Sequence, residues 1–316
     1  MSESGRLIIV TPVYEDEEAC SKLFKRLGEE LGPRLFVVAV DDGSVKQPLS
    51  ASTLSNQRVQ GVVLKLRRNV GHQRAIAIGL SYVAEQQGDD DSVVVMDSDG
   101  EDLPETVTTL ITMLAEPNID VVVAQRRSRV ESIRFKVFYA VYKHLFKLMT
   151  GRSISFGNFM ALTPAAVKRL AAMQETTIHV AGAVLASKLR TALCPLDRGP
   201  RYAGQSKMNF VGLALHGFKG LMVFAEDVLV RVGITCATIA SASVIGIVAA
   251  IALKLIGFST PGWFSVALGI LVLMLMQTGA LSLMTLMLTG VVRSGSVSSL
   301  ISYRDFVEAE LFTETN

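Results

Sequence analysis

Short apolar runs alternate with longer segments of helical character over the first 125 residues. The alternation is typical of a mostly parallel sheet with helices on both faces, an α/β fold. In such sheets ligands bind at the carboxyl ends of the strands. The predicted strands are 7–10, 35–40, 59–66, 92–96 and 119–124, and the predicted helices are 15–31, 69–86 and 104–115.

Two later runs, about 232–253 and 263–292, are long and apolar enough to cross a bilayer, which takes roughly 20 residues. The stretch 232–292 contains one lysine and no acidic residue. A short link joins the two runs, so they predict a helical hairpin that returns to its starting side. Residues 294–316 should then lie beside the first part of the chain.

Basic residues at the ends of this hairpin indicate its orientation. Arg231, Arg293 and Arg304 flank the open ends and Lys254 lies at the tip. The positive-inside rule therefore favours a cytosolic first part, as in a protein of the bacterial inner membrane.

Two amphipathic segments precede the hairpin. Residues 210–224 have the position of a helix in the membrane interface. Residues 132–150 combine basic and aromatic positions, and they fit either an interfacial helix or a core helix with a solvated basic side. Within the first long run, Ala242, Gly246 and Ala250 recur every four residues. Such a small-residue face packs helix on helix, and it admits a homo-oligomer.

Composition agrees with a membrane protein. Half of the residues are hydrophobic and the mean hydropathy is +0.40, more than a soluble globule needs. Cys20, Cys194 and Cys236 show no spacing typical of a zinc site or a disulfide framework, which fits a reducing compartment. The N-terminus leads directly into a strand, and we expect no cleavable signal peptide.

The strongest candidate for chemistry is the acidic turn at 97–102. Asp97, Asp99 and Glu101 follow the strand 92–96, and a proline-started helix comes next. Closely spaced carboxylates at a strand end suit Mg²⁺ or Mn²⁺, which bind one or two carboxylates together with substrate phosphates. The alternative is a solvated acidic turn in which Asp102 caps the helix.

Polar motifs follow one another at successive strand ends, at 11–14, 41–44, 68–71 and 97–99. Their order is more specific than any one of them. The chain resembles glycosyltransferase family 2, whose members have a GT-A nucleotide-sugar domain. Within that family it is similar to the polyisoprenyl-phosphate branch, which includes dolichol-phosphate mannose synthases and bacterial bactoprenol glucosyltransferases. The resemblance rests on the terminal helix pair and on the segments 11–14, 41–44, 68–76, 97–99, Arg126 with Arg129, and 198–208.

The resemblance implies roles for individual residues. Donor binding falls to Pro12, Tyr14, Glu15, Asp41, Asp42, Arg68, Asn69 and His72. Catalysis falls to Asp97, Asp99, Arg126 and Arg129, with Asp99 and Glu101 as ligands of Mg²⁺ or Mn²⁺. The acceptor phosphate falls to Arg198, Arg201, Ser206 and Lys207. The chain departs from the family pattern at Glu15, where an Asn is common, and at Asn158, where an Asp is common.

The implied organisation has four parts: a GT-A catalytic domain at 1–208, an interfacial amphipathic helix at 209–227, two transmembrane helices at 228–293 and a cytosolic tail at 294–316. The implied activity is inverting transfer of one sugar from a UDP- or GDP-sugar to a polyisoprenyl phosphate at the cytosolic membrane face. No nucleic acid is expected as a partner. The alternative is a non-catalytic membrane scaffold, or a partner of a system that translocates lipid-linked sugars.

Other enzyme classes are excluded by the sequence. No two glycines lie two residues apart, which excludes a GxGxxG dinucleotide fingerprint. No glycine is followed by lysine, which excludes a P-loop. Processive synthases of the same family carry a Gln-x-x-Arg-Trp segment, whereas the single tryptophan here is Trp263, at the hairpin.

Overall fold

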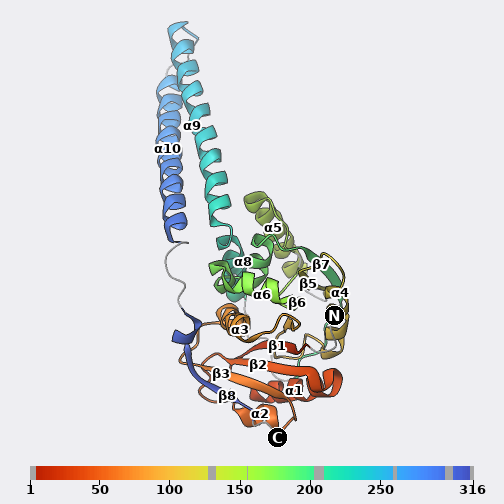
Figure 1. Cartoon of the computed structure of the whole chain (residues 1–316). Helices are drawn as coiled ribbons and strands as arrows, with labels where there is room; N and C mark the ends of the chain where they lie inside the picture. Colours follow the sequence, from red (N-terminus) through yellow and green to blue (C-terminus); the bar gives the residue numbers. More distant parts are fainter. Residues whose placement is uncertain are drawn as a thin grey trace. The chain divides into compact units, whose positions relative to one another are not determined.

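The computed structural model describes residues 5–126, 133–154, 156–202, 210–258, 262–295 and 302–313. Within these residues, one eight-stranded sheet has the order β7-β5-β6-β4-β1-β2-β3-β8 (Figure 1). The pairs β1–β2, β1–β4, β2–β3 and β5–β7 are parallel, and β6 and β8 run antiparallel to their neighbours. The strands are β1 (Leu7–Val13), β2 (Leu35–Asp41), β3 (Gln60–Leu66), β4 (Ser92–Val95), β5 (Val121–Arg126), β6 (Met160–Leu162), β7 (Thr191–Leu196) and β8 (Val307–Phe312). The predicted mostly parallel α/β sheet is confirmed.

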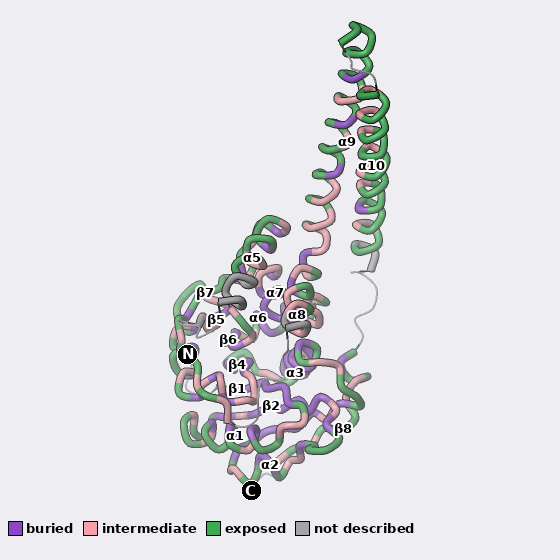
Figure 2. The backbone as a smooth tube through the Cα atoms, turned by 180° about the vertical axis from the view of Figure 1, so that it is seen from behind, coloured by how far each residue is buried: buried purple, intermediate pink, exposed green. Residues whose placement is uncertain are grey.

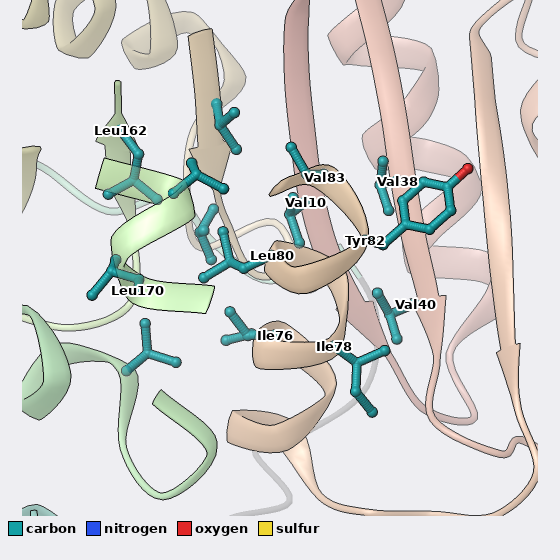
Figure 3. Close-up of a cluster of buried hydrophobic side chains, with 14 of the residues drawn as sticks. Val10, Val38, Val40, Ile76, Ile78, Leu80, Tyr82, Val83, Leu162 and Leu170 are labelled. Atoms are coloured by element: carbon teal, nitrogen blue, oxygen red, sulfur yellow. The ribbon is translucent and has the colours of Figure 1, made fainter. Parts of the chain in front are cut away.

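Helices cover both faces of the sheet. Alternate residues of each strand point to opposite faces, so Ile9 packs with α1 (Glu17–Leu31) and α4 (Val107–Leu114), while Val10 packs with α3 (His72–Gln86). Figure 3 shows the α3 side, where Ile76 and Leu80 meet the strand valines. Shorter helices complete the layers: α2 (Ala51–Ser55), α6 (Pro164–Ala171), α7 (Val180–Ala186) and the 3₁₀ turns Gly32–Arg34, Pro104–Thr106, Gln174–Thr177 and Tyr303–Asp305.

The C-terminal residues form a strand of this sheet. The sequence predicts a tail at 294–316, but β8 pairs with β3 from Val62 opposite Phe312 to Leu66 opposite Val307. Tyr303 packs edge-on against Tyr82, with ring centroids 6.2 Å apart, and its hydroxyl donates to Glu85 at 2.8 Å. The strand therefore covers the exposed edge of β3, which would otherwise present unpaired backbone groups.

Two long helices form a separate unit with the segment 143–152. They are α9 (Ala225–Leu255) and α10 (Trp263–Gly295), which lie side by side (Figures 1 and 2). Gly233 faces Thr285 and Gly246 faces Leu271, so the two helices run antiparallel. Both are long and apolar enough to cross a membrane, since each contains an 18-residue window with a mean hydropathy of 2.3 in α9 and 2.1 in α10. The predicted helical hairpin of two candidate membrane-spanning helices is confirmed.

The small residues of α9 lie inside the hairpin. Cys236, Ser243 and Ala250 recur every seven residues and are buried, whereas Ala242 of the predicted small-residue face is exposed. Large apolar side chains point outward instead: Ile245, Val248, Ile270, Leu283 and Met287 are all more than half exposed. The small-residue seam is thus used between α9 and α10, and a homo-oligomer through it stays a prediction.

Two more helices carry exposed apolar side chains. On α8 (Phe210–Met222), Leu215, Phe218 and Met222 are each more than half exposed, beside the exposed Lys219. On α5 (Ile133–Thr150), Val141, Leu145 and Leu148 are exposed, while Phe146 is fully buried against Phe224. The described part of α5 therefore combines an internal anchor with an apolar outer surface.

A buried histidine pair should make this fold sensitive to acid. His179 caps α7 by accepting from the Gly182 amide at 3.0 Å, and its Nε2 lies 3.1 Å from Nε2 of His216. Burial, reinforced by the nearby His216, lowers the pKa of His179 to about 3. Between about pH 3 and about pH 6.5, the unfolded chain binds a proton at this histidine and the folded chain does not. The free energy of unfolding therefore falls by up to about 1.4 kcal/mol for each pH unit of acidification in this range.

We expect the thermal unfolding midpoint to decrease between about pH 7 and pH 5, and to decrease less in His179→Asn, which keeps an oxygen acceptor for the Gly182 amide. Unfolding midpoints of both proteins at the two pH values check this. An equal decrease in both proteins would mean that other groups cause the acid sensitivity.

Candidate active site

The carboxyl ends of β1, β2, β3 and β4 bring the predicted donor-binding motifs to one edge of the sheet. A pocket at this edge is lined by five of the eight predicted donor residues, together with Val13 and Gly71. The five are Pro12, Tyr14, Asp42, Asn69 and His72. Tyr14 is 45% exposed at this pocket. Arg68 is also exposed and lies next to Asn69 in the chain.

The two aspartates after β2 hold neighbouring loops. Asp41 is fully buried, and its carboxylate accepts from the amides of Ser44 and Leu49, each at 2.9 Å. Asp42 accepts from the amides of Val70 at 2.7 Å and Gly71 at 2.9 Å. Burial raises the pKa of Asp42, although these two amide donors oppose the shift. Asp41 therefore shapes the turn, while Asp42 both lines the pocket and fixes the loop before α3.

Glu15 fixes the facing loop. It has a positive φ of 49°, and its carboxylate accepts from three successive amides, those of Val45, Lys46 and Gln47, at 2.8 to 3.1 Å. These amide donors lower the pKa of Glu15. Glu15, which replaces the Asn common in the family, is thus an anion that orders residues 44–47. A direct contact of Glu15 with the donor stays a prediction.

The acidic turn is held by its own backbone. Asp102 is buried and accepts from the Asp97 amide at 3.0 Å, and Asp99 accepts from the Glu101 amide at 3.0 Å. Asp102 therefore closes the turn from within, and it does not cap the helix that follows, because the turn Pro104–Thr106 begins without a side-chain cap. Asp97, Asp99 and Glu101 keep partly exposed side chains at the strand edge.

Two arginines of a distant segment pair with this turn. Arg201 bridges two carboxylates, from Nη2 to Asp99 at 2.7 Å and from Nε to Glu101 at 2.9 Å. Arg198 pairs with the other oxygen of Glu101 and lies 3.9 Å from Asp102. Burial and the neighbouring Asp97 raise the pKa of Asp99, and the two arginines oppose that shift. The predicted acceptor-phosphate arginines thus lie against the predicted metal ligands.

His72 lines this pocket and also contacts the acidic turn. It is the first residue of α3, and its Nε2 lies 3.2 Å from Asp97 and 3.1 Å from the side-chain amide of Asn158. Burial opposes its protonation, but the carboxylates of Asp97, Asp99 and Asp102 outweigh burial and raise the pKa of His72. An imidazolium at this place would favour a negatively charged ligand, as does the N-terminus of α3.

The residues present fit a divalent cation. Asp99 and Glu101 offer hard oxygen atoms that lie close together, because two nitrogen atoms of a single guanidinium contact them. Among the described residues, no three Asp, Glu, His or Cys side chains gather into a complete metal cage. This donor set suits Mg²⁺ or Mn²⁺ completed by substrate phosphates better than a protein-only site.

Some predicted residues lie outside the described part of the structure. Arg129, Ser206 and Lys207 belong to its gaps, and of Arg126 only the backbone is described, at the end of β5. Sequence reasoning missed the contacts of Tyr202, whose amide donates to the Asp99 carbonyl at 2.8 Å and whose ring lies against Gly100. It also assigned no structural role to Gly43, which comes close to the Arg68 backbone.

Comparison with known proteins decides the family. The model of the family described as glycosyl transferase family 2 matches residues 8–175, more than half of the chain, and covers β1 to α6 with the donor pocket and the acidic turn. The chain belongs to glycosyltransferase family 2. Its resemblance to that family is confirmed, and the family uses nucleotide sugars as donors.

Relatives agree with this assignment. An uncharacterized glycosyltransferase of Synechocystis sp., sll0501, is 29% identical over 230 residues, which are 69% of each chain. The uncharacterized glycosyltransferase YkoT of Bacillus subtilis is 25% identical over 278 residues, 84% of this chain and 81% of that one. Both alignments extend beyond the 168 residues that the family model matches.

A solved structure supports the GT-A fold. Glucosyl-3-phosphoglycerate synthase of Mycobacterium tuberculosis, crystallised with Mn²⁺, UDP-glucose and phosphoglyceric acid, superposes with a TM-score of 0.50 at 18% identity. The superposition covers 72% of this chain and 80% of that one. The predicted GT-A domain is therefore confirmed as a fold.

Proposed function

We propose that this family 2 glycosyltransferase transfers one sugar from a UDP- or GDP-sugar to a polyisoprenyl phosphate at the cytosolic face of a membrane. The observation that carries the proposal is a catalytic sheet whose chain leaves through α8, forms an apolar hairpin and returns as β8. A membrane anchor of this kind would keep the site close to an acceptor that is itself a membrane lipid.

The hairpin has the character of a membrane-spanning pair. The 31 residues of α9 extend about 46 Å, longer than the roughly 30 Å of bilayer hydrocarbon. In a soluble helix pair most large apolar residues would lie in the seam, whereas here small residues of α9 lie there and many large ones face outward. Outward-facing Ile, Val, Leu and Met side chains suit contact with lipid.

The return of the chain supports a hairpin with both ends on one side. Both α8, before the hairpin, and β8, after it, belong to the unit that contains the sheet. Since one compact unit lies on one side of a membrane, the chain must cross an even number of times. Arg231 and Arg293 at the open ends favour the cytosol as that side.

Reporter fusions should therefore find the C-terminus and the loop before β1 on the same, cytosolic side, and a reporter inserted at about residue 259 on the opposite side. Cysteine labelling in intact and in opened cells would check the same topology. An extracytosolic C-terminus with an active enzyme would contradict the paired crossing.

The chemistry of the site suits a phosphate acceptor. A phosphate monoester with a second pKa of about 6 is largely a dianion near neutral pH, so it needs no side chain to remove a proton. The site must then orient this anion, balance its charge against the donor diphosphate, and stabilise the leaving group. Arg198 and Arg201 supply cationic groups, and the departure to Asn158 removes nothing that such an acceptor needs.

A divalent cation held by Asp99 and Glu101 would neutralise charge on the leaving nucleoside diphosphate. Asp97 would face the donor sugar, with His72 holding its orientation through the 3.2 Å contact. Single displacement by the acceptor oxygen forms the new glycosyl phosphate bond as the bond to the diphosphate breaks, and it inverts the anomeric centre. The mycobacterial neighbour also contains a phosphate-bearing acid beside UDP-glucose.

A panel assay tests this proposal. Purified protein in detergent with Mn²⁺ would be incubated with individual UDP- and GDP-sugars and undecaprenyl phosphate, and the lipid fraction analysed by mass spectrometry. We expect one donor to give a lipid product heavier by a single sugar. Donor binding without a lipid or water-soluble sugar product under all conditions would favour the scaffold alternative.

A further inference from the structure

Arg201 already occupies the oxygen atoms that a divalent cation would take. Its planar guanidinium donates to Asp99 at 2.7 Å and to Glu101 at 2.9 Å, a forked arrangement that binds carboxylates strongly. Its side chain is 28% exposed, so it is neither fixed in the core nor fully solvated. A divalent cation that binds these two oxygen atoms would displace this guanidinium.

The backbone under Arg201 is fixed independently of its side chain. The Gly199 amide donates to the Glu101 carbonyl at 3.0 Å, and the Tyr202 amide to the Asp99 carbonyl at 2.8 Å. The Tyr202 ring covers Gly100 so closely that an added Cβ would lie 2.5 Å from it. The segment 199–202 therefore stays in register with the acidic turn when the Arg201 side chain changes partners.

Once displaced from the two carboxylates, the Arg201 guanidinium would lack an anionic partner. Together with Arg198 it would face a divalent cation at short range, and like charges repel. A guanidinium matches a phosphate in the same forked manner as it matches a carboxylate. A phosphate monoester entering beside the cation would supply that partner.

We infer that Arg201 exchanges between the acidic turn and the acceptor phosphate, so that divalent cation and acceptor bind cooperatively. The inference rests on the proposed function for the identity of the acceptor, but not for the competition between Arg201 and the cation. Coupling of this kind is reciprocal: each ligand strengthens the binding of the other by the same factor. A cation bound together with the donor would then prepare the site for the lipid.

The first test measures Mn²⁺ alone, by electron paramagnetic resonance of free Mn²⁺ with the full chain in detergent. Removing the competing guanidinium in Arg201→Gln should tighten Mn²⁺ binding on the order of tenfold. Arg201→Lys keeps the charge but cannot bridge two carboxylates, and it should tighten binding less. The control Arg190→Gln removes an arginine paired with Asp120 at 2.6 Å, distant in the chain from the acidic turn, and should leave Mn²⁺ binding unchanged.

Unchanged or weaker Mn²⁺ binding in both Arg201 variants, with the control behaving as wild type, would overturn the inference, because Arg201 would then only support the turn. Folding of each variant is checked by its thermal unfolding midpoint. If Arg201→Gln fails to fold, the Arg201→Lys result decides.

The second test measures a short-chain isoprenyl phosphate by calorimetry with and without saturating Mn²⁺. We expect Mn²⁺ to tighten its binding on the order of tenfold in wild type, and less in Arg201→Gln. An equal effect of Mn²⁺ in the two proteins would overturn the exchange. If no protein binds the isoprenyl phosphate while phosphoglyceric acid does bind, the proposed acceptor is wrong and the first test still decides the competition.

Discussion

Replacing Asp99 by alanine should reduce sugar transfer on the order of a thousandfold or more, without loss of folding. Asp99 is one of two carboxylates at which a divalent cation would bind, and it also pairs with Arg201. The variant removes a metal ligand and leaves the buried core of the sheet unchanged. Initial rates with saturating donor and Mn²⁺, compared with the unfolding midpoint, check this result.

Glu105→Gln is the matched control for Asp99→Ala. Glu105 lies near the same turn but pairs with Arg26 at 2.7 Å, on the α1 side. Its loss should cost about 0 to 1 kcal/mol in stability, which is what an exposed ion pair contributes, and little activity. Full activity of Asp99→Ala, or of wild type in excess chelator, would contradict the metal assignment.

Replacing Gly43 by alanine should weaken donor binding at least tenfold and destabilise the fold. Gly43 has φ of +70°, which costs a residue with a Cβ about 1 to 2 kcal/mol. An added Cβ would also lie 2.5 Å from the Arg68 carbonyl carbon and 2.6 Å from the Asn69 nitrogen. The loop that carries Asn69 and His72 would have to move away from the pocket.

Gly32→Ala separates these two costs. Gly32 has nearly the same φ, +68°, but nothing lies within 4 Å of an added Cβ. Because Gly32 combines φ +68° with ψ −159°, a region that is almost exclusive to glycine, alanine there should cost about 1 to 3 kcal/mol in stability and keep wild-type donor affinity. Calorimetric titration of UDP and GDP, with unfolding in denaturant, measures both effects. Equal donor affinities in the two variants would show that the close approach of the loops is not needed.

Much of the catalytic architecture follows from local signals. The carboxylates at 97–101 come directly after a buried strand, so their place at the sheet edge depends only on strand direction. The two apolar runs are equally clear, because length and lack of charge suffice to predict a helical hairpin. Figure 2 shows the contrast: buried positions concentrate in the sheet, and exposed ones along α9 and α10.

Other features depend on contacts between distant segments. The carboxylates of Glu15 and Asp41 accept hydrogen bonds from loop amides, and residue type alone does not reveal such partners; their contact with the donor stays a prediction. Arg198 and Arg201 are about 100 residues from the carboxylates they pair with. The alternation of Val307, Ala309 and Leu311 with the acidic residues between them is typical of strand β8. A run of only six residues is nevertheless too short to predict a strand from its pattern alone.

One competition assay tests the central claim most directly. The enzyme, its donor and Mn²⁺ would receive equal amounts of undecaprenyl phosphate, undecaprenol and phosphoglyceric acid in one detergent solution, with products separated and identified by mass spectrometry and nuclear magnetic resonance. The account predicts a sugar attached through the phosphate of the polyprenol, with the anomeric configuration inverted relative to the donor. Sugar found mainly on phosphoglyceric acid or on the free alcohol, or a retained configuration, would contradict it.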